Sequence, residues 1–160
     1  ISVTGVQTCA LPISLIIPET VKAEMSDGVL ELAVKSFNQR TASTIAEKVT
    51  AAGPVRGIIL DLRGDPGGLL DQAVAVADLF MDKGVIATLR GRHPGAMQFY
   101  AATAGDISLG APIVMLLDGR SASAAEILAA ALQENGRAIA VGTASVGKGT
   151  VQTKIGRAHV

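Results

Sequence analysis

Hydrophobic and polar residues follow two different periods along the chain. Short segments that alternate in polarity or are continuously apolar are typical of strands. They lie at 29–37, 57–62, 85–89, 113–117 and 138–141, and another begins at 150. Longer segments with apolar residues at helical spacing predict helices at 41–52, 69–81 and 123–135, and a polar segment at 91–110 predicts a loop. We therefore expect an α/β fold of stacked βαβ units with a mostly parallel sheet.

The composition narrows the class of protein. The 160 residues suffice for one domain with a core, and 49% of them are hydrophobic, which excludes a disordered chain. Lys and Arg number 14, as do Asp and Glu. Because a nucleic-acid binder normally has an excess of basic residues, this balance argues against that class. No apolar run reaches the roughly 18 residues that a membrane span needs.

The two ends of the chain are related at the level of DNA. TCALPI at 8–13 back-translates to a string whose reverse complement encodes IGRAH, the sequence at 155–159. A sequencing adapter translated at both ends would give this relationship. We therefore expect residues 1–14 and 155–160 to be adapter-derived and 15–154 to be native. Cys9 and His159 then fall outside the native part, which leaves too few ligands for a Cys/His metal site.

Three glycine-rich segments each follow an apolar strand segment, at 65–68, 119–123 and 147–149. In open α/β sheets, binding and catalytic residues gather at the carboxyl ends of the strands. The last segment nearly matches a phosphate-binding loop, since residues 142–148 satisfy G-x-x-x-x-G-K. However, Gly149 stands where that motif needs Ser or Thr, and the following residues alternate like a strand instead of opening a helix.

Ser123 has two compatible interpretations. With Glu126 three residues later it forms the S-x-x-E pattern of a capping box, in which the serine caps a helix. Ser121 offers a second possible cap. At the turn from a strand into a helix, Ser123 could also be a nucleophile whose oxyanion is held by the backbone N–H groups of the helix start.

A serine nucleophile needs a base. His93 is the one histidine of the native part, and its place in a glycine-containing loop favours a solvated residue over a member of a Ser-His-Asp triad. A lysine can serve instead when burial lowers its pKa. Lys148 has a glycine on each side, which would let the backbone turn tightly and bury the amine. A surface lysine remains the alternative.

Four motifs together resemble the carboxyl-terminal processing proteases, also called tail-specific proteases. They are DLRGDPGGLLD at 61–71, ADLFMDKG at 77–84, GRSASAAEI at 119–127 and GKGTVQ at 147–152. The resemblance extends from 30 to 153. It implies a ClpP/crotonase-like α/β core and a serine-type endopeptidase with a Ser–Lys dyad that needs no metal or cofactor. The substrates would be C-terminal tails or unstructured segments of proteins, with small apolar residues near the cut.

The resemblance also assigns roles to residues. Ser123 would be the nucleophile, Lys148 the general base and Gln152 the residue that positions the lysine. The backbone N–H groups of Ala124 and of Gly67 or Gly68 would form the oxyanion hole.

The sequence departs from the family pattern in a few respects. Asp65 stands where the family often has Asn, and Val146 where an aromatic residue is common. Family members usually carry a PDZ domain upstream, and we expect it to be missing before residue 15. The resemblance implies a periplasmic, lumenal or extracellular location and leaves the oligomeric state open. The alternatives are a crotonase-like acyl-CoA enzyme, which needs no serine nucleophile, and a non-catalytic peptide-binding relative.

Overall fold

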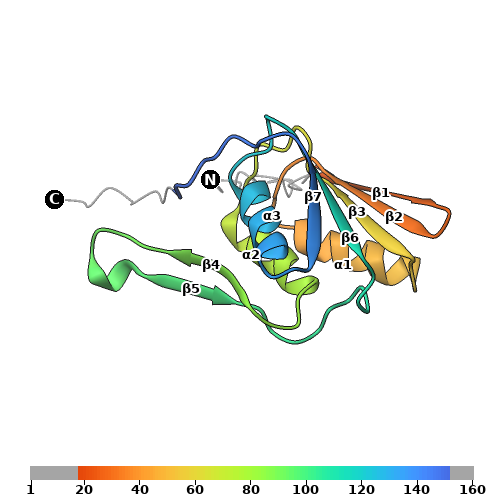
Figure 1. Cartoon of the computed structure of the whole chain (residues 1–160), viewed down its shortest axis with the longest axis horizontal. Coiled ribbons are helices and arrows are strands. Elements are labelled where there is room, and N and C mark those ends of the chain that lie inside the picture. The colour runs from red at the N-terminus through yellow and green to blue at the C-terminus, as the bar shows by residue number, and fades with distance from the viewer. Residues whose placement is uncertain (1–17, 152–160) are drawn as a thin grey trace, which may run out of the picture.

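The computed structural model describes residues 18–151, which form a five-stranded sheet, three α-helices and a separate β-hairpin (Figure 1). Both expected adapter segments and Gln152 lie outside the described residues. The elements follow one another as β1 (Val21–Ser26), β2 (Val29–Val34), α1 (Thr41–Ala52), β3 (Gly57–Asp61), α2 (Leu70–Leu79), β4 (Val85–Leu89), the 3₁₀ helix η1 (Pro94–Ala96), β5 (Gln98–Ala101), β6 (Ile113–Leu117), α3 (Ala124–Glu134) and β7 (Ala138–Gly142).

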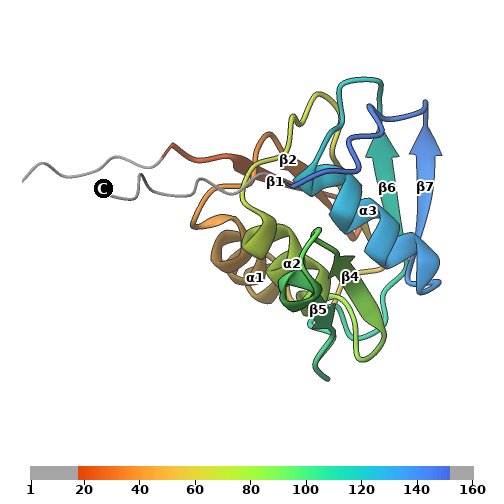
Figure 2. The ribbon, with the colours of Figure 1, turned by 90° about the vertical axis from the view of Figure 1, so that its left-hand side faces the viewer.

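The main sheet has the order β1-β2-β3-β6-β7. Only β1 and β2 pair antiparallel, and the other three pairs are parallel. Each crossover moves along the sheet in the same direction. Because such crossovers are right-handed, they place their helices on one face, as Figure 2 shows for α1, α2 and α3. The expected α/β fold with a mostly parallel sheet is confirmed.

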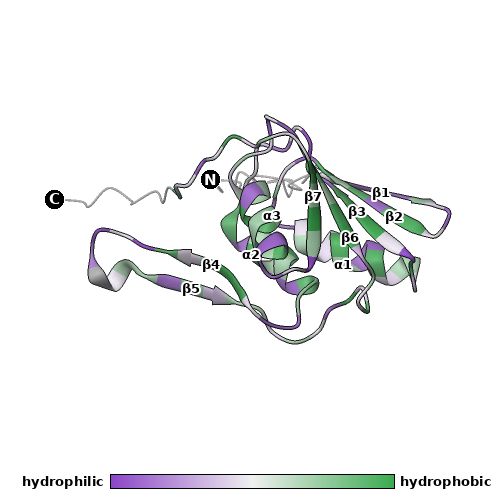
Figure 3. Cartoon of the chain, in the orientation of Figure 1, coloured by the Kyte–Doolittle hydropathy of each residue, from purple (hydrophilic) through white to green (hydrophobic). Residues whose placement is uncertain are grey.

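The core lies between this sheet and the helices. Every second residue of β2 is buried, whereas β3 is buried along almost its whole length, as a central strand should be. The strands β3, β6 and β7 are rich in hydrophobic residues in Figure 3, although the edge strand β7 fully buries only Ala138. The helix α1 contributes Ile45 and Val49, and α3 contributes Leu128 and Leu132, each pair four residues apart on one helix face.

Two strands of the structure, β1 and β5, are not predicted by the sequence patterns. The edge strand β1 buries only Val21, and β5 buries no residue fully, so neither shows the alternation that predicts a strand. The strand β5 lies in the segment expected to be a loop. It pairs with β4 in a hairpin that extends away from the sheet (Figure 1). The strand expected to begin at residue 150 is not present in the described residues 150 and 151.

The carboxyl ends of β3, β6 and β7 meet at one edge of the sheet, and hydrogen bonds join the loops that follow them. The Gly64 N–H donates to Asp118 Oδ1 at 2.9 Å, and the Ala122 N–H donates to the Asp65 carbonyl at 2.9 Å. The Val146 N–H donates to the Ser121 carbonyl at 3.0 Å. The three glycine-rich segments are thereby held together. Within residues 18–151, no helix is long and apolar enough to cross a membrane.

Candidate active site

Ser123 is the residue immediately before α3, and its backbone is strained. Its φ of 55° and ψ of −114° lie in a region that residues with a side chain rarely adopt, at a cost of about 1–3 kcal/mol. The neighbouring contacts hold this conformation, since the Ser123 N–H donates to Glu126 Oε2 at 2.7 Å. That contact is the carboxylate half of the predicted capping box. Strain of this kind gathers at functional sites, and Ser123 is half-buried at the edge of a pocket.

Ser121 occupies a different environment. It is fully buried, and its hydroxyl donates to the Leu62 carbonyl at 2.8 Å and accepts the Asp118 N–H at 3.0 Å. These bonds join the loop after β3 to the loop after β6. The same loops are joined through Asp118, whose pKa is lowered chiefly by the N–H of Gly64 and also by the N–H of Arg120. Ser121 is therefore a structural residue.

Glu126 connects the start of α3 to the loop after β7. Besides the Ser123 N–H, its carboxylate accepts the Ser145 hydroxyl at 2.6 Å and the N–H groups of Gly147 at 2.5 Å and Lys148 at 3.0 Å. Burial alone would raise the pKa of Glu126, but these hydrogen bonds together lower it below its usual value. The sequence predicts the helix cap but not the bonds to residues 145–148, which lie 19 to 22 positions away.

The turn at 65–68 packs directly against Ser123. A Cβ atom on Gly67 would lie 2.8 Å from Ser123 Cβ and 2.8 Å from the Ala124 nitrogen, so only glycine fits there. The Gly67 N–H donates to Asp65 Oδ1 at 2.7 Å. Among residues 18–151, neither the Gly68 nor the Ala124 N–H has a hydrogen-bond acceptor. The backbone donors that remain beside Ser123 are thus those of Gly68 and Ala124.

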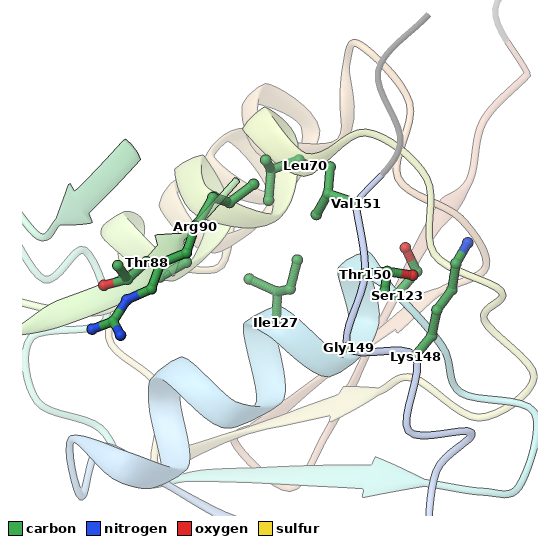
Figure 4. A pocket seen from close by; sticks show the side chains of 11 residues that line it. Leu70, Thr88, Arg90, Ser123, Ile127, Lys148, Gly149, Thr150 and Val151 are labelled. Atoms are coloured by element: carbon green, nitrogen blue, oxygen red, sulfur yellow. The ribbon is translucent and has the colours of Figure 1, made fainter. Parts of the chain in front are cut away.

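Ser123 and Lys148 line the same pocket of about 370 Å³, between α3, the strand β4 and residues 148–151. Figure 4 shows both side chains at one end of it, with Leu70, Ile127 and Val151 supplying apolar walls. Lys148 is exposed to solvent, so the surface position that the sequence left open holds here and the amine is not buried. A Cβ atom on Gly147 or Gly149 would meet no other atom within 4 Å, so that side of the loop is open.

The remaining candidates lie elsewhere. His93 is exposed beside the short helix η1 between β4 and β5, where its Nδ1 accepts the Gly95 N–H at 3.1 Å, as expected of a solvated loop residue. It does not line the pocket with Ser123. Residues 147–151 contain no helix, whereas a phosphate-binding loop opens one at its lysine, and Gly149 lacks the hydroxyl of that motif; both observations argue against the phosphate-loop interpretation of 142–148. The arrangement of a strained serine, nearby backbone donors and a lysine suits acyl transfer.

Comparison with known proteins identifies relatives of the chain. Residues 28–156 match the sequence profile of Peptidase family S41. A carboxy-terminal-processing protease of Bartonella bacilliformis is 43% identical over 129 residues, which are 79% of this chain and 30% of that protein. A chloroplastic C-terminal processing peptidase of Tetradesmus obliquus is 31% identical over 152 residues, 95% of this chain and 31% of that protein. The chain thus spans about a third of the length of these relatives.

A solved structure has the same fold. The photosystem II D1 C-terminal processing protease superposes with a TM-score of 0.74 at 26% identity, over 86% of this chain and 40% of that one.

Proposed function

The chain belongs to peptidase family S41, and on that basis we propose that it carries the catalytic core of a carboxyl-terminal processing protease. Ser123 is the nucleophile and Lys148 the general base. Relatives named for carboxy-terminal processing, at 43% and 31% identity, support this assignment. The observation that carries it is the strained backbone of Ser123, at the start of a helix and in one pocket with Lys148.

The choice between the two serines rests on their hydrogen bonds. The Ser121 hydroxyl is buried and has both a donor and an acceptor, so attack by it would break the contact between two loops. Ser123 instead lines the pocket, and the N–H groups of Ala124 and Gly68 lie beside it without acceptors in the described part of the chain. These two groups form the oxyanion hole. Because Gly67 has no side chain, the turn at 65–68 can lie close to Ser123.

The proposed reaction uses these groups in two steps. The neutral amine of Lys148 takes the proton of the Ser123 hydroxyl as the oxygen attacks the scissile carbonyl carbon. The carbonyl oxygen becomes an oxyanion that accepts from the Ala124 and Gly68 N–H groups. The tetrahedral intermediate collapses as the leaving amine takes the proton from Lys148. Water then attacks the acyl-enzyme with Lys148 again as base, and Ser123 regains its proton. Gln152, outside the described residues, positions the lysine.

The pocket favours an extended peptide with small apolar side chains. Leu70, Ala87, Ile127 and Val151 give the pocket an apolar lining that suits such side chains. A peptide lying in it would cover Lys148 and exclude water from the proposed dyad. The substrates are C-terminal tails or unstructured segments of proteins, met in the periplasm, a lumen or outside the cell.

A fluorophosphonate probe tests this function directly. The probe should phosphonylate the parent chain at Ser123, as located by mass spectrometry of the digested protein. Ser123→Ala should abolish the label, and Ser121→Ala should keep it. A parent chain that folds but takes no label would contradict a serine peptidase and favour an acyl-CoA enzyme or a peptide-binding relative. A label on Ser121 would show that the nucleophile is misassigned.

A further inference from the structure

Asp65 is a buried carboxylate that the proposed reaction does not use. Its side chain has no exposure to solvent. Oδ1 accepts the Gly67 N–H at 2.7 Å, and the carbonyl of the same residue accepts the Ala122 N–H at 2.9 Å. Asp65 therefore contacts both the turn that carries Gly68 and the loop that carries Ser123. Its second oxygen, Oδ2, is buried and has no hydrogen-bond partner among residues 18–151.

The contact with Gly67 fixes the peptide next to the nucleophile. Gly67 lies against Ser123 Cβ and the Ala124 nitrogen so closely that a methyl group does not fit between them. Without an acceptor at position 65, the Gly67 N–H would lose its partner beside Ser123 and could compete as a donor there. The following peptide has a second anchor, because the Gly67 carbonyl accepts the Phe37 N–H at 3.0 Å. With the acceptor in place, the Gly67 N–H is bonded to Asp65. The Gly68 N–H then has no acceptor among the described residues and remains free to bind the oxyanion.

We propose that Asp65 is a positioning residue of the oxyanion hole: by accepting the Gly67 N–H, it selects the Gly68 N–H as the donor to the oxyanion. This role rests on the proposed serine peptidase function. It requires an acceptor at position 65 and not a charge. Asparagine keeps a carbonyl oxygen at the same place and should therefore perform it, whereas alanine should not.

The charge of Asp65 supplies a spectroscopic signal for this contact. Burial raises the pKa of Asp65 to about 6, against the effects of the Gly67 hydrogen bond and the Lys35 ammonium. The other charged groups on the segments that surround it are Asp61, Arg63, Asp118 and Arg120. Ionisation of Asp65 near pH 6 makes the bond from Gly67 charge-assisted and hence stronger. The Gly67 amide proton should move downfield as the pH rises through this range.

The test combines nitrogen-15 NMR with fluorophosphonate labelling of the full 160-residue chain. In the parent, the Gly67 amide should titrate with a midpoint near pH 6, and Asp65→Asn should remove the titration while keeping the amide protected from hydrogen exchange. At pH 8, Asp65→Asn should label Ser123 within about threefold of the parent rate. Asp65→Ala should label at least about tenfold more slowly, because the turn that carries the Gly68 donor loses one of its two hydrogen-bonded anchors. Ser108→Ala, a buried polar change outside the pocket, should label at the parental rate.

The outcomes separate this role from the proposed function. If Asp65→Ala folds and labels as fast as the parent, the role of Asp65 is wrong and the peptidase assignment stands. Should Asp65→Ala fail to fold, the comparison of Asp65→Asn with the parent decides, since loss of labelling in the asparagine variant contradicts a pure acceptor role. If the parent takes no label, the proposed function fails, and the role of Asp65 fails with it.

Discussion

The carboxylate of Glu126 holds the backbone of Lys148: Oε2 accepts the Lys148 N–H at 3.0 Å. The same oxygen accepts the Ser123 N–H at 2.7 Å. One side chain therefore fixes the distance between the backbone of the proposed nucleophile and that of the proposed base. Neither amide would keep this position by secondary structure, because Ser123 precedes its helix and Lys148 lies in a loop.

Glu126→Gln should separate the two residues. A glutamine amide has one acceptor oxygen, whereas four donors point at Glu126, and its NH₂ group would face N–H groups. We expect fluorophosphonate labelling of Ser123 to slow by about tenfold or more, with a loss of about 1–3 kcal/mol in the free energy of unfolding. Glu134→Gln, at the exposed end of the same helix, is the control and should change neither quantity.

The Glu126 contacts should also appear in acid unfolding. The lowered pKa of Glu126 means that its stabilising contribution is complete above its ordinary pKa of 4.5 and is lost as the pH falls below it. Glu126→Gln should therefore lose less stability than the parent between pH 5 and pH 3. Equal losses in the two chains would contradict the hydrogen-bond network.

Two substitutions of Ser123 should measure the free-energy cost of its strained backbone conformation. Ser123→Ala and Ser123→Gly both lack the hydroxyl and should take no label. Ser123→Ala should stay within about 1 kcal/mol of the parent, because only a cap interaction is lost. Ser123→Gly should be more stable than Ser123→Ala by about 1 kcal/mol in urea denaturation, since glycine adopts a φ of 55° without strain. Equal stability of the two variants would mean that the φ of Ser123 costs nothing.

Ser121→Ala should give the opposite result. Removal of its hydroxyl leaves the Asp118 N–H without its acceptor, and the buried Leu62 carbonyl keeps only the Asp65 N–H at 3.2 Å, which should cost about 1–3 kcal/mol. Labelling of Ser123, measured at a temperature where the variant is folded, should stay close to the parental rate. A stable variant that cannot be labelled would give Ser121 a direct part in the reaction.

The sequence predicts those helices and strands that show a regular spacing of hydrophobic residues. The helix at 41–52 and the strands at 85–89 and 113–117 begin and end as expected. Buried residues recur at helical spacing in the first and at strand spacing in the last, whereas β4 buries only Ile86. The strands β1 and β5 bury too few side chains to leave such a pattern. The Glu126 contacts with residues 145–148 depend on how the start of α3 meets the loop after β7. The spacing of hydrophobic residues along the sequence does not show such a contact. The sequence leaves open whether Lys148 is buried or exposed for the same reason, since its flanking glycines give freedom to turn but no neighbour to cover the amine.

Two substitutions of Lys148 test whether it acts as a base. Lys148→Arg should be as inactive as Lys148→Ala, because a guanidinium stays protonated and cannot accept the serine proton. The parental labelling rate should rise with pH, since only a neutral amine acts as a base. Lys83→Arg, in the turn before β4 and outside the pocket, is the matched control and should label like the parent. Appreciable labelling of Lys148→Arg would mean that position 148 contributes charge alone and that another group takes the proton.

Asp65 and its neighbour Asp61 should affect stability in opposite directions as the pH changes. Burial raises the pKa of Asp65 to about 6 from its ordinary value of 3.8, so the folded chain binds its proton more tightly than the unfolded chain. The raised pKa of Asp65 therefore reduces the free energy of unfolding as the pH rises from about 4 to above 6, by up to about 3 kcal/mol. Asp61 has a lowered pKa, first because of the hydrogen bonds from the Arg63 side chain, so its contribution is lost as the pH falls below 3.8.

Urea denaturation of the parent, Asp65→Asn and Asp61→Asn between pH 3 and pH 8 measures both effects. Relative to the parent, Asp65→Asn should gain stability steadily from pH 4 to pH 7, because the amide cannot become a buried charge. Asp61→Asn should fall behind the parent as the pH rises above 3, where the parent forms the ion pair with Arg63 at 2.8 Å and the variant does not. Parallel stability curves for Asp65→Asn and the parent across pH 4 to 7 would show that Asp65 does not titrate in this range. The two aspartates are four residues apart, so a general effect of lost negative charge would move both variants in the same direction, and only their separate surroundings can move them apart.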